Sequence, residues 1–390
     1  MNTQQRATID LIKSALKNEK ILLSKDIDLD AVYDIAKSHG IAAIIYNGAY
    51  ICGVNNQNEI MKKLFVLTCE YISYSQRQIC MIDRILSEFE KQKIEYLPLK
   101  GIVLKNLYPK PEMRIMGDAD ILVRLSQYEN AKKIMSELGF KEQEVTDHEM
   151  HWMHPSLHVE LHSKLIPSYN KDYYNYFGDG WKLAKKVCDS SRFEMTNENE
   201  FIYLFTHFAK HYRDAGIGIK HILDIYVYLN SNPNLNEKYI IAELKKLQLN
   251  TFYVNIIDTL DVWFNNKEEN EVTELITKTI FNSGAKGSYE SALLSAALKI
   301  KKSGNNKKSV RLKKMLGAVF KPYKIMTNRY KILRKCPFLL PFCWFANIFD
   351  LFKGKKLSKG LNQFKIMSEE NINTYQQSLN FVGLDFNFKE

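Results

Sequence analysis

The sequence predicts an α+β fold in which a small mixed β-sheet lies between two helical regions. Residues 1–92 and the residues after Glu198 repeat apolar side chains at three- and four-residue spacing, the period of an α-helix. Between them, residues 94–162 hold several short runs of strand-forming residues. The chain has 390 residues, 45% hydrophobic and 25% charged, which is ordinary for a globular protein and excludes a disordered or fibrous chain.

The N-terminal region, 1–92, is expected to be helical. Residues 8–18 and 30–50 have amphipathic patterns, and a longer pattern runs from Asn58 to Phe89 without proline or glycine. Because nothing in that last stretch would break a helix, it predicts one long, continuous helix.

The central region, 93–195, predicts a small α/β unit in which strands and helices alternate. The expected elements are a strand at 94–99, a short helix at 100–108, a loop at 109–117, a strand at 118–123, a helix from Ser126 closed by Gly139, and short strands at 141–162.

The C-terminal half divides into a helical domain, 196–300, and a basic, aromatic segment, 301–390. Residues 299–359 contain 18 Lys and Arg but one acid, Asp350, whereas the whole chain carries a formal net charge of +11. The rest of the chain is therefore net negative. A positive segment on an acidic body indicates contact with a polyanion.

Two interpretations of 309–356 stay open. Residues 336–352 contain five Phe and Trp344 beside cations, which suits docking on an anionic membrane surface. Alternatively, this part is a helical subdomain whose aromatic side packs on the body. The 17-residue stretch contains two prolines, so a spanning helix is not expected. Nucleic acid is a less favoured partner: the interleaved basic and aromatic residues are compatible with base stacking, but no RNP, OB-fold or helix-turn-helix signature supports it.

The cysteines and the start of the chain favour a cytoplasmic location, peripheral at the inner membrane face if the membrane interpretation holds. Six scattered cysteines without a CxxC pair indicate reduced thiols. No basic segment followed by an apolar one opens the sequence, so no signal peptide is expected.

Two aspartates begin the second predicted strand, in the order Gly117-Asp118-Ala119-Asp120. Because side chains alternate between the faces of a strand, Asp118 and Asp120 are expected to point the same way. Two such carboxylates resist burial unless a cation lies between them, and Mg²⁺ prefers oxygen ligands of this kind. An ordinary solvated turn before a strand would have the same pattern.

The segment His158-Val159-Glu160-Leu161-His162 predicts a strand with one polar face. By the same alternation, Glu160 shares a face with His158 and His162 and is a candidate third carboxylate beside the Asp pair. A half-exposed strand with polar residues outside is the plain alternative. Zinc is another, because eight of nine histidines lie between residues 148 and 221, although HExxH is absent.

Four basic residues are candidate phosphate contacts. Lys100 precedes Gly101 at a predicted strand-to-helix turn, where free N–H groups attract phosphate, and Arg114 lies just before the Asp pair. Lys210 and Lys220 lie on predicted helices and could contact phosphate or acceptor. The alternatives are an ordinary turn at Lys100 and, for Lys220, an ion pair with a residue four positions along its own helix.

Taken in order, these features resemble the DNA polymerase β-like nucleotidyltransferase superfamily, in which a glycine turn precedes a DxD strand and a later strand carries one acid. The chain is most similar to an uncharacterised bacterial nucleotidyltransferase family. The resemblance covers roughly residues 90–355 and is carried by residues 97–123, 158–162, 206–229 and 329–352.

The resemblance implies a polymerase β-like core and a site for two Mg²⁺ ions, with Mn²⁺ as a substitute. Asp118 and Asp120 would hold the ions with the triphosphate of an NTP substrate, and Glu160 would bind the catalytic ion and help activate the acceptor hydroxyl. Gly117, Lys100 and the backbone of Gly101 would approach the phosphates. The turn at Gly101 departs from the superfamily pattern, in which a small residue, serine or glycine, follows the glycine. Here the bulky Ile102 follows it.

The predicted function is Mg²⁺-dependent transfer of a nucleoside monophosphate from an NTP to an acceptor hydroxyl on a sugar, metabolite, peptide or protein. The competing class is a non-catalytic nucleotidyltransferase-like adaptor that binds membrane or another polyanion, and a zinc-dependent hydrolase is a third. Convergence of Asp118, Asp120 and Glu160 in an open cleft would favour catalysis.

Overall fold

The structure is a computed structural model that describes residues 1–168, 170–285, 287–302, 323, 326, 331–334, 336–340, 343–344 and 366–385. The chain divides into two compact units. The first contains Met1–Ser288 with Asn380–Lys389, and the second contains Tyr289–Leu379. The four-segment division expected from the sequence remains a prediction.

The first unit begins with three helices, as predicted: α1 (Thr3–Lys17), α2 (Leu29–His39) and α3 (Ala42–Ile51). Asn2 caps α1 in a capping box with Gln5, and the Asp28 carboxylate accepts from two N–H groups at the start of α2. Such caps satisfy backbone donors that have no partner inside the helix. Helix α2 ends at Gly40, whose φ of 66° lies in the left-handed region that favours glycine.

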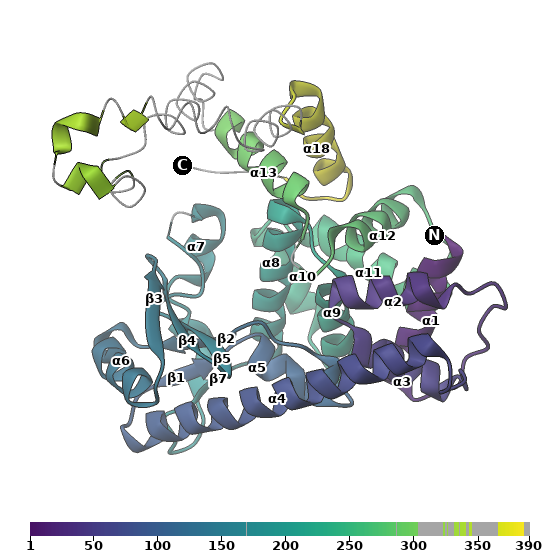
Figure 1. The fold of residues 1–390 in the computed structure, drawn as a ribbon, viewed down its shortest axis with the longest axis horizontal. Helices are drawn as coiled ribbons and strands as arrows, with labels where there is room; N and C mark the ends of the chain where they lie inside the picture. Colours follow the sequence, from purple (N-terminus) through teal and green to yellow (C-terminus); the bar gives the residue numbers. More distant parts are fainter. Residues whose placement is uncertain are drawn as a thin grey trace. The chain divides into compact units, whose positions relative to one another are not determined.

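The predicted long helix is α4 (Glu59–Lys91), which is uninterrupted and capped by Asn58. Its N-terminal part packs against α2 and α3, and its C-terminal part packs under the sheet and against α6 (Tyr128–Glu137) (Figure 1). The helix therefore ties the N-terminal helices to the central sheet.

The central sheet is mixed, which confirms the predicted fold class. In the described part of the chain it has five strands in the order β1-β2-β5-β4-β3, of which β2 and β5 run parallel and the other neighbours antiparallel. The strands are β1 (Tyr96–Pro98), β2 (Ala119–Val123), β3 (Lys141–Val145), β4 (Glu149–His154) and β5 (Leu157–His162).

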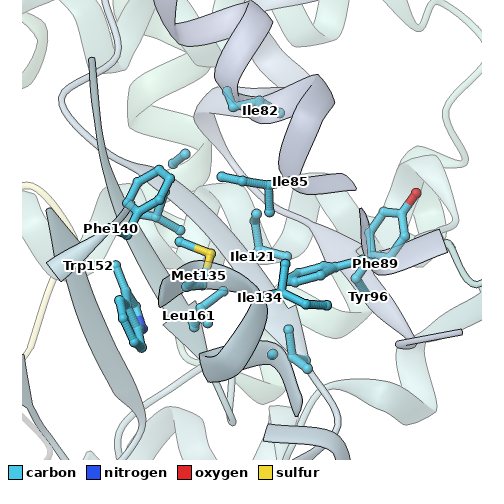
Figure 2. Packing of buried hydrophobic residues seen from close by; sticks show 14 of the residues in the cluster. Ile82, Ile85, Phe89, Tyr96, Ile121, Ile134, Met135, Phe140, Trp152 and Leu161 are labelled. Carbon is cyan, nitrogen blue, oxygen red and sulfur yellow. The ribbon is translucent and has the colours of Figure 1, made fainter. Parts of the chain in front are cut away.

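One face of this sheet forms the core of the central unit. Ile121, Trp152 and Leu161 pack with Phe89 of α4 and Met135 of α6 (Figure 2). Because side chains alternate along a strand, their neighbours in sequence occupy the opposite face, away from α4 and α6. That opposite face carries the polar residues of the candidate site.

The connections differ in detail from the predicted ones. The turn after β1 contains the short helix α5 (Gly101–Leu104), and α6 begins at Tyr128, two residues after the expected start. Helix α7 (Lys171–Phe177) and the hairpin β6 (Ala184–Lys186)–β7 (Phe193–Met195) were not predicted.

The chain then returns to helix, as predicted, in α8 (Asn197–Ala215), α9 (Ile219–Ser231), α10 (Glu237–Lys246), α11 (Asn250–Phe264) and α12 (Glu271–Ser283). Stacked and tilted rings, among them Phe205, Phe208 and Phe252, form part of their core. Thr196 caps α8, which places the start of this helix within two residues of the expected one.

The second unit contains α13 (Tyr289–Lys302) and most of α18 (Glu369–Phe381). Most of 309–356, on which the membrane interpretation depends, lies outside the described residues; the described part includes a small buried cluster of Met326, Leu333 and Cys343. Across the described ranges, every helix is too short or too polar to cross a bilayer. All six cysteines fall within those ranges and are free thiols.

Glu200 on α8 gives the fold a pH dependence that can be measured. Burial, and then the charge of Glu194, raise the pKa of Glu200 to about 7. A carboxyl group whose folded-state pKa is raised stabilises the fold most below its unfolded pKa of about 4.3, and stability is lost as the pH rises through about 7. We therefore expect Glu200→Gln to raise the free energy of unfolding at pH 8 by ~2 kcal/mol and to leave it unchanged near pH 4.5.

Urea unfolding of the parent and Glu200→Gln at both pH values checks this expectation. Exposed Glu137, replaced by Gln, is the matched control and should shift neither value. An equal effect of Glu200→Gln at pH 4.5 and pH 8 would show that the carboxyl group is not the cause.

Candidate active site

The polar face of the sheet borders a cavity of about 620 Å³. Side chains from β2, β4 and β5 line it on the sheet side, and residues of α5, α8 and α9 line it together with several connecting segments. All nine site residues expected from the sequence line this one cavity: Lys100, Gly101, Arg114, Gly117, Asp118, Asp120, Glu160, Lys210 and Lys220.

Asp120 lies at the centre of the polar face. It pairs in register with Glu160 across the parallel strands β2 and β5, and its exposed fraction is 3%. Its Oδ1 accepts hydrogen bonds from Lys100 Nζ at 2.7 Å and from His162 Nε2 at 2.9 Å. Burial alone would raise the pKa of Asp120, but the Lys100 ammonium and His162 outweigh it and hold the pKa well below its ordinary range.

Lys100 reaches Asp120 from a strained backbone. Its φ of 46° and ψ of −110° place a non-glycine residue where side chains rarely lie, at the start of α5. Such strain costs on the order of 1–3 kcal/mol and is often found at functional sites. Burial opposes the charge of Lys100, but Asp120 raises its pKa, so the ion pair is maintained.

Asp118 and Glu160 form an acid trio with Asp120, and the surroundings of their two carboxyl groups differ. Asp118 precedes β2 by one residue, and burial followed by the charges of Asp120 and Glu160 raises its pKa. Glu160 Oε2 lies 3.6 Å from His162 Nε2. Ligand atoms of Asp120, Glu160 and His162 lie within 4.8 Å of one another, and Asp118 is not part of that closest group. The three acids therefore share a cavity and repel one another, with Asp118 at the greater separation.

Arg114 lines the cavity, but its guanidinium is already engaged. Its Nε and Nη2 donate to the two carboxylate oxygens of Asp224 at 2.9 and 2.8 Å, and Tyr108 Oη donates to the same carboxylate at 2.9 Å. This buried group fastens the loop before β2 to α9. The contacts of Arg114 therefore favour a role in positioning this loop.

Lys220 has a different environment. Asp224, four residues along the same helix, is occupied by Arg114, and Lys220 has no ion-pair partner among the described residues. Burial, and then the charge of Arg114, lower the pKa of Lys220 to about 8. A half-buried cation that lines a cavity without a partner is a natural contact for an anion.

The two glycines of the expected phosphate turn are not equivalent. A Cβ at Gly101 would lie 2.8 Å from the Met116 side chain, so this glycine makes room for protein packing. A Cβ at Gly117 would meet nothing within 4 Å. The backbone that a ligand can approach closely is therefore at Gly117, next to Asp118.

Several residues that the sequence did not single out as site residues also line the cavity. His162 hydrogen-bonds to Asp120, and its position two residues after Glu160 on the same strand face was the available signal. His207 and His211 of α8 contact one another at 2.9 Å between their Nε2 atoms. Burial lowers the pKa of both, that of His211 to about 4, so both are neutral near pH 7.

A small mixed sheet that presents paired acids to a cavity beside α8 and α9 fits the nucleotidyltransferase class expected from the sequence. The chain belongs to the uncharacterised nucleotidyltransferase family, whose model matches residues 25–265.

One solved structure, of the antibiotic-resistance factor ANT(2'')-Ia, is also similar to this chain. The match covers 50% of this chain and 100% of that chain, at 12% sequence identity and a TM-score of 0.32. Similarity this distant supports no conclusion about the site. A comparison with curated proteins found no match.

Proposed function

We propose that this protein transfers a nucleoside monophosphate from an NTP to an acceptor hydroxyl in a Mg²⁺-dependent reaction. The observation that carries the proposal is the set of three carboxylates, Asp118, Asp120 and Glu160, on the wall of one cavity that Lys220 also lines. Membership of a nucleotidyltransferase family supports the same conclusion.

The residues present fit a hard divalent cation. Three carboxylates offer oxygen ligands, which Mg²⁺ prefers. Burial, and then the charges of Asp120 and Glu160, raise the pKa of Asp118, and a bound cation would offset both effects. Asp118, Asp120 and Glu160 would hold two Mg²⁺ ions or Mn²⁺. Bound ions of this kind neutralise the triphosphate and stabilise the attacking and leaving oxygens.

The chain's own residues would position the reactants. Within the described part of the chain, both side-chain hydrogen bonds to Asp120 go to Oδ1, from Lys100 and His162, which leaves Oδ2 for a cation. In the reaction the acceptor oxygen attacks the α-phosphorus, the bond to the bridging oxygen breaks and pyrophosphate leaves. Glu160 would accept the proton of the acceptor hydroxyl.

Lys220 would contact the phosphates, together with Lys210 and the open backbone at Gly117. With a pKa of about 8, Lys220 remains mostly charged at pH 7, and an anion beside it would raise that pKa. Arg114 would act indirectly, by holding the loop that carries Gly117 and Asp118.

Lys220→Gln tests the phosphate role. We expect KM for the NTP to rise roughly tenfold or more, because one charge-assisted contact is worth about 1.5–3 kcal/mol, with little change in stability. Lys133→Gln, at an exposed lysine of α6 with a loose 3.9 Å ion pair, is the matched control. Steady-state kinetics against NTP concentration measures both, and an unchanged KM in Lys220→Gln would remove this residue from the site.

The function itself is tested with each labelled NTP, Mg²⁺ or Mn²⁺ and an extract of the source cells. Mass spectrometry should find one acceptor heavier by a nucleoside monophosphate, and pyrophosphate should be released. Failure with all four NTPs would favour the non-catalytic adaptor, whose membrane contact through 309–356 falls mostly outside the described residues.

A further inference from the structure

A second group of metal-ligand side chains lies beside the acid trio and shares no member with it. His148, Glu149 and His162 come from the start of β4 and the end of β5, where Glu149 and His162 pair in register. One ligand atom of each lies within 4.8 Å of the others, and all three residues line the cavity.

His148 is oriented by neighbours that fix its proton. Its Nδ1 lies 3.2 Å from Asp147 Oδ1 and 3.1 Å from Thr146 Oγ1, and the Thr146 hydroxyl already donates to the Glu149 carbonyl oxygen. Nδ1 is therefore the donor. In the neutral ring Nε2 then carries a lone pair, and it faces Glu149 Oε2 at 2.9 Å. Two acceptors at this separation repel unless a cation lies between them.

His162 is oriented in the same manner from the other side. Its Nε2 donates to the Asp120 carboxylate. Its Nδ1 is buried and has no hydrogen-bond partner within the described ranges, while Glu149 Oε2 lies 3.6 Å away. A buried ring nitrogen without a partner is costly, and it requires an explanation in the surrounding structure.

We propose that His148 Nε2, His162 Nδ1 and the Glu149 carboxylate bind a divalent transition-metal ion of the zinc class. Two imidazoles and one carboxylate form a donor set that suits such an ion, and each imidazole is held by a carboxylate behind it, as metal-bound histidines usually are. The 2.9 and 3.6 Å separations bracket the about 3.3 Å expected between two tetrahedral ligands.

The ion would take the place of a proton between His148 and Glu149 and would satisfy His162 Nδ1. Three protein ligands leave a coordination position open, and all three residues line the cavity. The cavity would therefore carry two kinds of metal site, one of hard oxygen ligands and one of mixed nitrogen and oxygen. The second site depends on neither NTP binding nor transfer.

Titration of the full-length, metal-free protein with Zn²⁺, followed calorimetrically, tests the proposal. We expect His148→Gln to weaken Zn²⁺ binding by more than the roughly 10–100-fold that loss of an outer-shell partner costs. Asp147→Asn removes such a partner at a half-exposed position that tolerates substitution, and we expect a loss of about tenfold or more. Asp147→Asn keeps the test decisive if His148→Gln does not fold.

Two matched variants separate this site from its neighbours. His158→Gln alters the adjacent group of His151, His158 and Glu160. Asp118→Asn alters the acid trio. Both should keep the Zn²⁺ site that His148→Gln weakens. The proposal is overturned if the parent shows no Zn²⁺ site, if His148→Gln and Asp147→Asn bind as the parent does, or if His158→Gln rather than His148→Gln loses the ion.

Discussion

Replacing both Asp118 and Asp120 by Asn is expected to abolish transfer, by on the order of 10³-fold or more. The two carboxylates are the acids of β2 and its preceding turn, and together with Glu160 they provide the negative charge that a divalent cation needs on this cavity wall. Asparagine keeps the shape of each side chain but removes that charge. Incorporation of label from an NTP into the acceptor measures the loss.

The two substitutions should differ in their effect on stability, and this difference can be measured in the single variants. Asp120→Asn leaves the buried Lys100 and His162 without their charged partner, so a loss of about 3–5 kcal/mol is expected. Asp118 has no such pair among the described residues, so Asp118→Asn should fold normally while losing transfer. Asp34→Asn, outside the cavity, is the control. Activity equal to the parent in folded Asp118→Asn would reject Asp118 as a ligand.

Asp224→Asn is expected to destabilise the first unit by about 3–5 kcal/mol, because one partner of a buried ion pair is removed while the other remains. Arg114 and Asp224 are each under a tenth exposed and form a two-pronged contact, to which Tyr108 adds a hydrogen bond. Without the Asp224 charge, the Arg114 guanidinium is buried beside Lys105 and Lys220, whose pKa values are lowered by burial and then by the charge of Arg114. Urea unfolding measures the change.

Asp258→Asn is the matched control for this prediction. It breaks the ion pair between Asp258 of α11 and Lys267, whose side chains are partly exposed, at 29% and 45%. Such a solvent-screened pair contributes little to stability, so the midpoint should hardly move. Equal losses in the two variants would show that the burial of the Arg114 pair is not what makes it important.

Strand alternation explains why much of the site could be predicted from the sequence. Period-two patterns in two segments were enough to place Asp120 and Glu160 on one polar face, and the register of β2 and β5 pairs them directly. The glycine-free pattern from Asn58 likewise predicted α4, because a helix of that length is determined by local periodicity.

The partners of the charged residues could not be predicted, because they depend on contacts between distant segments. Arg114 was expected to face phosphate, yet its partner is 110 residues away on α9. Lys100 was expected to cradle phosphates, yet a strained backbone turns its ammonium onto Asp120. Helix α7 and the β6–β7 hairpin were missed because three to seven residues are too few to establish a period.

The most direct test of the proposed function is a crystal structure with Mg²⁺ and an NTP analogue whose α,β-bridging oxygen is replaced by methylene. We predict that the triphosphate lies in the cavity, that the ions contact Asp118, Asp120 and Glu160, and that Lys220 reaches a phosphate oxygen. Nucleotide bound elsewhere, or ions that avoid all three carboxylates, would contradict the proposal that this cavity is a nucleotidyltransferase site.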